Sequence, residues 1–357
     1  PGPEAQAGLY DRLAGGLRGS LSGENDGGDL ALRWEAGTEM GIQEDKRRNF
    51  RNEQGAPGEA ILDQEETVLS FGVFVQGLLH HVSGATLLSA IRYHRTSFEA
   101  KDFFQGPEDP DDSGTRAMDA FSPSMGISVP LRESVTLRTS FSTLFQTPTT
   151  TELANRPSGS GGFNPEVEPE KGWTAEAGLR FHLGYDHVEI TVFDTHLSRE
   201  LVPFEVPEAP GRVFFRNAGK SRYRGAELAT ELTLGSGFRF RGSYSLLDAR
   251  FREYAPSGAD YRGNKVPGAP RHSLDALLSW EGPSPLRGIP GFATLRGMYR
   301  GEVPVDDANS DAARAFLVLD LRVGLESLAM GPFSLSPFLG VDNLLDRAYT
   351  PSVSVNA

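Results

Sequence analysis

The chain has 357 residues and a formal net charge of −13, which argues against a nucleic-acid partner because phosphate binding needs a basic surface. It contains no run of about 18 apolar residues, which excludes a helical membrane protein. It contains no Cys, which excludes disulfides and thiolate metal sites.

Long β-strands are the elements predicted along the chain. Apolar and polar residues alternate regularly over 30–40, 173–183, 226–234, 272–280 and 316–326, and less regularly over 66–79 and 84–97. About fourteen such segments of about 10–14 residues are predicted, and a tilted strand that crosses a bilayer needs about 9–11. The 41 Gly and 24 Pro suit many turns and few long helices.

The predicted connections alternate between short and long. Short turns are expected near 22–27, 81–84, 131–134, 183–186, 234–237, 282–290 and 327–332. Long polar loops are expected near 43–65, 99–118, 147–170, 203–220, 251–271 and 302–313. One end of an up-and-down sheet would then carry trimmed turns and the other end elaborate loops, as in outer-membrane barrels.

The alternation also predicts two unlike faces. In hydrocarbon every backbone polar group must pair, so the sheet of a whole barrel must close, with its apolar face toward lipid and its polar face toward a wet lumen. The residues expected to point outward are Leu179, Phe181, Leu228, Leu232, Leu274, Leu278, Leu319 and Leu321. Those expected to point inward are Arg180, Glu227, Asp275, Asp320 and Arg322. The predicted fold is an all-β, antiparallel, up-and-down transmembrane β-barrel.

Four local patterns, in order, resemble TonB-dependent outer-membrane receptors. The first is Phe145-Gln-Thr-Pro-Thr-Thr-Thr-Glu-Leu, followed by Asn164-Pro-Glu-Val-Glu-Pro-Glu, with Pro148, Glu152, Asn164, Pro165, Pro169 and Glu170 at the family's positions. The others are a strand with Tyr223, Gly225 and Glu227, an element with Pro267 and Pro270, and Asn343-Leu344-Leu-Asp346-Arg-Ala-Tyr349. We interpret the prolines as structural, because Pro has no N–H and suits strand entries and loops.

This resemblance implies that residues 1–357 are a partial barrel domain, about fourteen strands of a 22-stranded barrel. The N-terminal plug domain, the short energy-coupling TonB box and the final strand would lie outside the chain. The stretch that starts at Asn343 would end the penultimate strand where it leaves the membrane, with Asn and Asp side chains bonded to nearby backbone. We expect the fragment to be an open, curved sheet, with free edges at residues 8–20 and 333–342.

The resemblance further implies a receptor for energised uptake of a scarce nutrient complex across the bacterial cell outer membrane. A ferric siderophore or similar iron chelate ranks first, because such receptors are common. Outer-membrane lipid and the TonB–ExbB–ExbD energy-transducing complex, acting through the plug, would be its partners. Two other classes stay open, a passive porin-type channel and an outer-membrane β-barrel hydrolase, although no G-x-S-x-G elbow occurs.

Aromatic and cationic residues of the outer loops are the candidate ligand contacts, because aromatics and arginines carry much of the binding energy at recognition surfaces. They are Phe204, Arg212, Phe214, Phe215, Arg216, Tyr254 and Tyr261. Packing within the loops is an equally good interpretation for each. No metal-ligand spacing, cofactor motif or catalytic residue is identified.

Overall fold

One antiparallel sheet forms the body of the protein. The computed structural model describes residues 6–105, 111, 113–154, 163–207, 213–284 and 289–356. In this part of the chain, fourteen strands join into one sheet whose order follows the sequence. The first seven are β1 (Gln6–Asp26), β2 (Leu30–Glu53), β3 (Ala56–His81), β4 (Thr86–Asp102), β5 (Gly114–Arg132), β6 (Val135–Gln146) and β7 (Glu170–Leu183). The other seven are β8 (Asp186–Ser198), β11 (Lys220–Gly235), β12 (Phe238–Glu253), β13 (His272–Pro283), β14 (Pro290–Arg300), β17 (Phe316–Leu325) and β20 (Phe338–Val341).

Small elements fill the connections. They are α1 (Thr150–Ala154), a 3₁₀ turn η1 (Pro256–Gly258), and three hairpins, β9 (Leu201–Phe204) with β10 (Phe214–Asn217), β15 (Val303–Pro304) with β16 (Ala312–Ala313), and β18 (Leu328–Met330) with β19 (Phe333–Leu335). Among the residues with described structure, no helix is long and apolar enough to cross a membrane.

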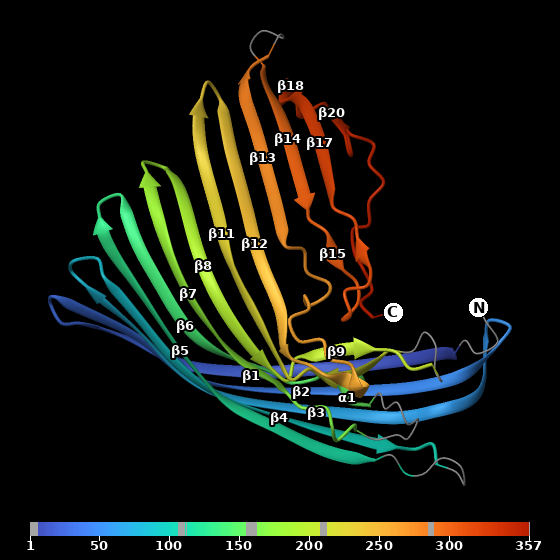
Figure 1. Ribbon diagram of the computed structural model, residues 1–357. Helices are drawn as coiled ribbons and strands as arrows, with labels where there is room; N and C mark the ends of the chain where they lie inside the picture. Colours follow the sequence, from blue (N-terminus) through green and yellow to red (C-terminus); the bar gives the residue numbers. More distant parts are fainter. Residues whose placement is uncertain are drawn as a thin grey trace.

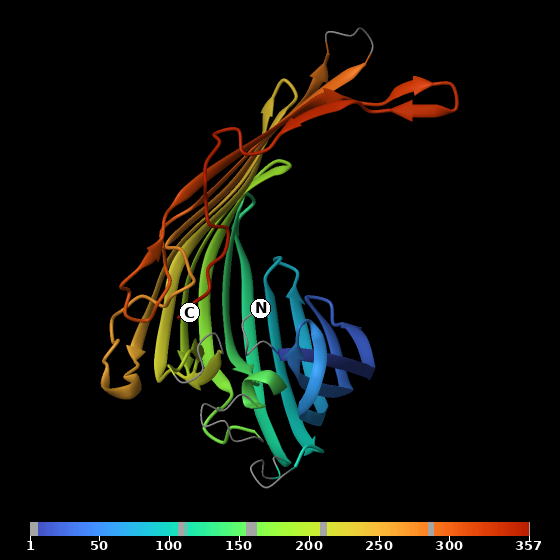
Figure 2. The ribbon, with the colours of Figure 1, turned by 90° about the vertical axis from the view of Figure 1, so that its right-hand side faces the viewer.

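The sheet is an open, curved wall, as predicted. Its order begins at β1 and ends at β20, and across the described ranges neither of these strands pairs with the other. Figure 1 shows the two edges well apart, and Figure 2 shows the same wall from the side, with α1 and β9 inside its curve. The fourteen strands therefore do not close into a smaller barrel.

The alternation of short and long connections is confirmed, with one correction. Residues 43–65 were predicted as a long polar loop, and this is wrong. β2 and β3 run on as a hairpin of 24 and 26 residues that turns at Gln54 and Gly55, both with positive φ. This outer part of the hairpin has polar side chains on both faces, so the alternation of apolar and polar residues that identifies a strand is absent there. The two strands nevertheless continue to pair, with cross-strand contacts such as the 2.8 Å ion pair between Arg47 and Glu66.

The position of the Asn343 turn also differs from the prediction. β20 pairs with β17 only from Leu321 to Gly324, so the regular ladder stops partway along β17. Beyond it, the Leu344 amide donates to the Leu319 carbonyl at 2.6 Å, and the Asn343 amide donates to the Asp320 carboxylate at 2.9 Å. The chain thus leaves the ladder beside β17, where positive φ at Asn343 and Asp346 ends the extended backbone.

The register places the two predicted sets of residues on opposite faces. Leu179 and Leu228 both lie opposite Ile190, whereas Arg180 lies opposite Glu189. The same register puts the remaining predicted residues on the expected faces of β11, β13 and β17. The apolar face is exposed along its length, as at Leu17, which is 81% exposed. The loops instead pack against the polar face, which is the concave side of the wall.

Candidate functional site

The candidate functional site is the elaborated end of the sheet, where the connections β6–β7, β8–β11, β12–β13 and β14–β17 meet over the concave face (Figure 1). Two buried apolar clusters anchor these loops. One joins Phe98, Ala100 and Met118 of the wall to Leu153, Phe163 and Val167 of the β6–β7 loop. The other joins Ala249 and Phe251 of β12 to Val202, Ala218, Tyr254 and Val266.

The first family-like pattern builds a capped turn of helix. Thr149 and Glu152 form a reciprocal capping box, in which the Thr149 amide donates to the Glu152 carboxylate at 2.7 Å and the Glu152 amide donates to the Thr149 hydroxyl at 3.3 Å. Pro148 before it is fully buried, and Leu153 within α1 is 0% exposed. This pattern therefore positions the β6–β7 loop, and its Pro and Glu are structural residues.

Arg116 of β5 holds the second half of that loop. Its guanidinium donates to the backbone carbonyls of Asn164 and Val167, the latter at 2.7 Å. The Asn164 side chain in turn accepts the Glu166 amide at 3.0 Å, while Pro165 is exposed and Pro169 is half-buried. Sequence reasoning missed Arg116, because a single Arg on a strand carries no signal of a partner 48 residues away.

The end of the same pattern reaches the next loop. The Glu170 carboxylate accepts the Leu201 amide at 2.5 Å, which ties the start of β7 to β9. Glu200, one residue before β9, accepts hydrogen bonds from the Ser221 and Tyr223 hydroxyls of β11. The family-like Tyr223 is therefore an anchor for the β8–β11 loop, while Glu227, further along the same strand, lies exposed on the concave face.

Most of the candidate ligand contacts form one cluster of rings around Arg216. The Arg216 guanidinium lies 4.3 Å from the ring centroid of Phe204, and its Nε donates to the Tyr254 hydroxyl at 3.1 Å. Tyr254 also packs on Tyr261, with ring centroids 5.7 Å apart, and Phe204 packs on Phe214 at 6.0 Å. The structure thus brings together side chains from the β9–β10 hairpin and the β12–β13 loop.

Burial divides these candidates. Phe214 and Tyr254 are 1% and 5% exposed, so the structure favours the other interpretation for these two, packing within the loops, and they support the cluster from within. Phe204, Phe215, Arg216 and Tyr261 are half-buried and keep part of their surface accessible. Arg212 lies outside the residues that the structure describes.

Asp307 is the buried centre that sequence reasoning did not find. It is 4% exposed, and its carboxylate accepts the Tyr254 hydroxyl at 2.9 Å. Its amide donates to the Asn356 side chain at 2.9 Å, and its carbonyl accepts from the Asn264 side chain at 2.8 Å. Asp307 therefore joins the β14–β17 connection to the β12–β13 loop and to the end of the chain, contacts that are too distant in sequence to predict.

The other family-like residues fix local backbone. A Cβ at Gly225 would lie 2.1 Å from the Leu246 carbonyl oxygen, so only Gly fits there. Pro267 precedes Gly268 at φ +83°, a pairing typical of a tight turn, and Pro270 is half-buried just before β13. The Asn343 side chain donates to the Arg347 carbonyl and accepts from the Arg347 amide, both at 3.1 Å, which confirms the prediction that this Asn bonds to nearby backbone.

The last part of that segment lies along the outer half of β17. The Tyr349 ring packs on Phe316 with centroids 4.8 Å apart, while Leu344 is 46% exposed. These residues thus hold the chain beside β17 without a regular ladder.

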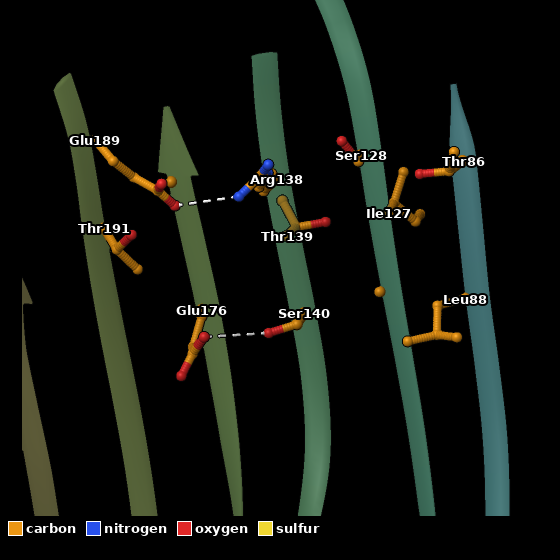
Figure 3. Close-up of a pocket in the computed structure, with 12 residues that line it drawn as sticks. Thr86, Leu88, Ile127, Ser128, Arg138, Thr139, Ser140, Glu176, Glu189 and Thr191 are labelled. Carbon is orange, nitrogen blue, oxygen red and sulfur yellow. Dashed lines mark hydrogen bonds and ion pairs between the residues drawn. The ribbon is translucent and has the colours of Figure 1, made fainter. Parts of the chain in front are cut away.

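A depression lies on the concave wall nearer the trimmed end, lined by Thr86, Leu88, Arg138, Ser140, Glu176 and Glu189 among others. Figure 3 shows Arg138 pointing toward Glu189 and Ser140 pointing toward Glu176. The nitrogen of Arg138 lies 3.5 Å from the Glu189 carboxylate oxygen, and the Ser140 hydroxyl lies 3.4 Å from that of Glu176. Arg180 also approaches Glu189, at 3.8 Å. This is a wall of paired charges, consistent with a polar lumen. Across the described ranges, no three His, Asp or Glu side chains are grouped to hold a metal ion.

Comparison with known proteins agrees with this architecture. A family model described as TonB dependent receptor-like, beta-barrel, matches residues 6–344. The ferrioxamine B receptor of Salmonella typhimurium (strain LT2) is 27% identical over 186 residues, which are 51% of this chain and 25% of that protein. The ferrichrome outer membrane transporter/phage receptor of Escherichia coli K12 is 26% identical over 185 residues, 52% of this chain and 24% of that protein.

Solved structures show the same fold. The ferric citrate transporter FecA, in its unliganded form, superposes with a TM-score of 0.80 at 17% identity, over 100% of this chain and 53% of that one. The siderophore receptor PiuA from Acinetobacter baumannii gives 0.75 at 17% identity, over 96% and 53%. The chain thus spans about a quarter of the length of these curated relatives and about half of these structures. The match over residues 6–344 shows that the chain belongs to the TonB dependent receptor-like β-barrel family.

Proposed function

We propose that the protein containing this chain is an outer-membrane receptor of Gram-negative bacteria that takes up a scarce nutrient complex, with a ferric siderophore or similar iron chelate as cargo. The observation that carries this proposal is family membership combined with the names of the relatives, which include receptors for ferrioxamine B and ferrichrome. The fold gives independent support, because an apolar convex face suits lipid and a concave face with paired charges suits a wet lumen.

The accessible part of the Arg216 cluster is the proposed point of first ligand contact in this chain. Phe204, Arg216 and Tyr261 lie together at the elaborated end and are anchored by buried neighbours. Pre-ordered aromatic and guanidinium surface costs little side-chain entropy on binding. Passage of the ligand would draw on the TonB–ExbB–ExbD complex, acting through a plug domain outside residues 1–357.

Uptake by whole cells tests the function. A strain that lacks the gene, and the same strain complemented with it, would be starved of iron and given ⁵⁵Fe-loaded ferrioxamine B or ferrichrome. We expect uptake only in the complemented strain, and its loss when a protonophore collapses the inner-membrane gradient. Uptake that persists with the protonophore would indicate a passive channel, and no uptake of any iron chelate would contradict the proposal. Release of fatty acid from vesicles by the purified protein would favour the hydrolase alternative.

A further inference from the structure

Charged side chains gather on the convex face of the wall, toward its elaborated end. Along β8 the outward residues are Ile190 and Val192, followed by Asp194 and His196 nearer the outer loops. The outward residues of β11 and β12 change from apolar to charged in the same way. We call the resulting group the convex cluster, and it consists of Asp194, His196, Arg222, Arg224, Asp248 and Arg250.

The position of the convex cluster in the sheet keeps it on the outside of any barrel. β8, β11 and β12 are each paired on both sides, and Figure 1 shows them in the middle of the wall. Strands that complete a barrel would join at the edges, β1 and β20, and so would not cover this surface. The cluster therefore faces whatever surrounds the barrel, and not its lumen.

The convex cluster lies where the apolar band ends. Asp194 is four residues beyond Ile190, about 13 Å along an extended strand, whereas the whole apolar band of a bacterial barrel is about 25 Å tall. Trp173 of β7 lies opposite His196 and stacks on it, with ring centroids 4.3 Å apart. Trp is enriched where hydrocarbon meets headgroups, so the cluster is at the level of the lipid headgroups.

The register arranges the cluster in two rows. In the row nearer the apolar band, Arg224 lies between Asp194 and Asp248. In the row nearer the outer loops, Arg222 lies between His196 and Arg250. Side chains directly opposite each other have Cβ atoms about 4.5–5.5 Å apart, and like charges there destabilise a sheet. An anion bound between Arg222 and Arg250 would remove this repulsion.

The two carboxylates neutralise only part of the positive charge. Asp194 accepts from Nε of Arg222 at 2.8 Å. Asp248 is shared, because it accepts from Nε of Arg250 at 2.8 Å and from Nη2 of Arg224 at 3.2 Å. Three guanidinium groups thus share two carboxylates, while the side chains of Arg222 and Arg250 remain 29% and 37% exposed. The row with Arg222 and Arg250 therefore carries unbalanced positive charge toward the surroundings.

We propose that Arg222 and Arg250 bind the phosphate headgroup of an outer-leaflet lipid. A phosphate oxyanion accepts charge-assisted hydrogen bonds from two guanidinium groups, whose planar shape matches it. The acyl chains of the same lipid would lie along Val192 and the other apolar side chains of the convex face. This inference rests on the membrane placement in the proposed function and goes beyond it, because the bound molecule is a lipid and not the cargo.

A lipid titration of the natural full-length protein tests this proposal. Delipidated protein in a nonionic detergent would be titrated with diphosphorylated lipid A, and bound lipid would be counted by native mass spectrometry. We expect binding that weakens as the ammonium acetate concentration rises, and that is weaker for phosphatidylcholine, whose phosphate is balanced by choline. Equal binding of the two lipids would overturn the proposal, and so would displacement of lipid A by an equal concentration of inorganic phosphate. The titration contains no iron chelate, so its outcome is separate from that of the uptake experiment.

The variant Arg250→Gln removes one of the two opposed arginines, and both carboxylates of the cluster keep an arginine partner. It should weaken lipid A binding about tenfold or more, the loss expected for a hydrogen bond between charged groups. Wild-type binding by this variant would overturn the proposal, and so would a wild-type dimer that the variant dissociates, because a second copy would then occupy the face.

Arg95→Gln is the matched control. Arg95 also lies on the convex face, but its neighbours are Phe71 and Asp119, with no second arginine opposite. It should bind lipid A as the wild type does, and a loss equal to that of Arg250→Gln would overturn the proposal. Arg250 also donates to the Gly263 carbonyl at 2.8 Å, so if Arg250→Gln fails to fold, Arg222→Lys decides. That variant keeps the charge and lacks the planar fork: weaker lipid A binding supports the proposal, and wild-type binding overturns it.

Discussion

Two adjacent leucines of β13 offer a direct test of the faces of the sheet. Leu278 lies opposite Phe240 of β12 and Leu295 of β14, so its neighbours on that face are apolar. Leu277 lies opposite Arg241 and Arg296 and lines a depression on the concave wall. The same substitution, Leu to Arg, therefore places a charge in lipid at one position and in the lumen at the next.

The two variants should differ by a large factor. A cation on the lipid face near the bilayer midplane costs about 2–4 kcal/mol, and the neighbours of Leu278 offer no carboxylate to pair with it. Leu278→Arg should thus lower the equilibrium constant for folding into lipid about 30- to 1,000-fold. Leu277→Arg meets two Arg side chains in a solvated space, where charge effects stay within about 1 kcal/mol.

Refolding into lipid vesicles measures this difference. The urea-unfolded full-length protein would be added to vesicles over a urea series, and the folded fraction would be read from heat-modifiable migration on gels. Equal losses for the two variants, or a greater loss for Leu277→Arg, would refute the assignment of faces and with it the membrane-spanning wall. The pair is matched in residue type, strand and depth, so general effects of Arg on expression cancel.

Three further changes test the loops and the wall. Arg116→Met should free two buried backbone carbonyls and cost about 2–3 kcal/mol of loop stability, measured as faster proteolysis within 147–169; unchanged proteolysis would contradict this. Gly225→Ala should prevent assembly in lipid vesicles, because the new Cβ would lie 2.1 Å from a carbonyl oxygen of β12. Gly15→Ala is the control, since a Cβ there meets nothing within 4 Å, and it should show normal heat-modifiable migration on gels. Arg47→Met should leave the fully buried Glu66 without its cation, although Gln64 still donates to it, and should lower the stability of the β2–β3 hairpin by about 3–5 kcal/mol, measured by hydrogen exchange. The double variant with Glu66→Leu should recover most of this loss, and an equal loss in both variants would argue against the pair.

The sheet could be predicted from the sequence wherever one face is apolar. Period-two alternation over segments such as 173–183 fixes both strand and face, because a slip of one residue would exchange the two faces. Reasoning from alternation failed at 43–65, because the β2–β3 hairpin continues past the part of the sheet that has an apolar face, and both of its own faces are polar. Its pairing rests on contacts such as the ion pair between Arg47 and Glu66, which only the register reveals.

The outer loops could be predicted much less well. The capping box of Thr149 and Glu152 is local, yet the sequence analysis identified this stretch only as a family-like pattern and not as a helix cap. The Arg216 cluster was identified as a set of residue types, yet only the fold shows that Tyr254 is buried beneath it. Asp307 and Asn356 meet across 49 residues, and nothing in either local sequence indicates the other.

This contrast bears on where ligand preference should be sought. The wall needs only apolar residues outward and polar residues inward, and so it tolerates extensive change, as the TM-score of 0.80 at 17% identity with a ferric citrate transporter shows. The loops depend instead on individual pairs, such as Arg116 with the Val167 carbonyl and Glu200 with Tyr223. Each pair fixes how one loop lies over the concave face, so a change at a single anchor reshapes the surface around Arg216. Two receptors with the same barrel can therefore present different outer surfaces. If the proposed receptor function holds, the ligand should follow from the loop anchors more than from the family.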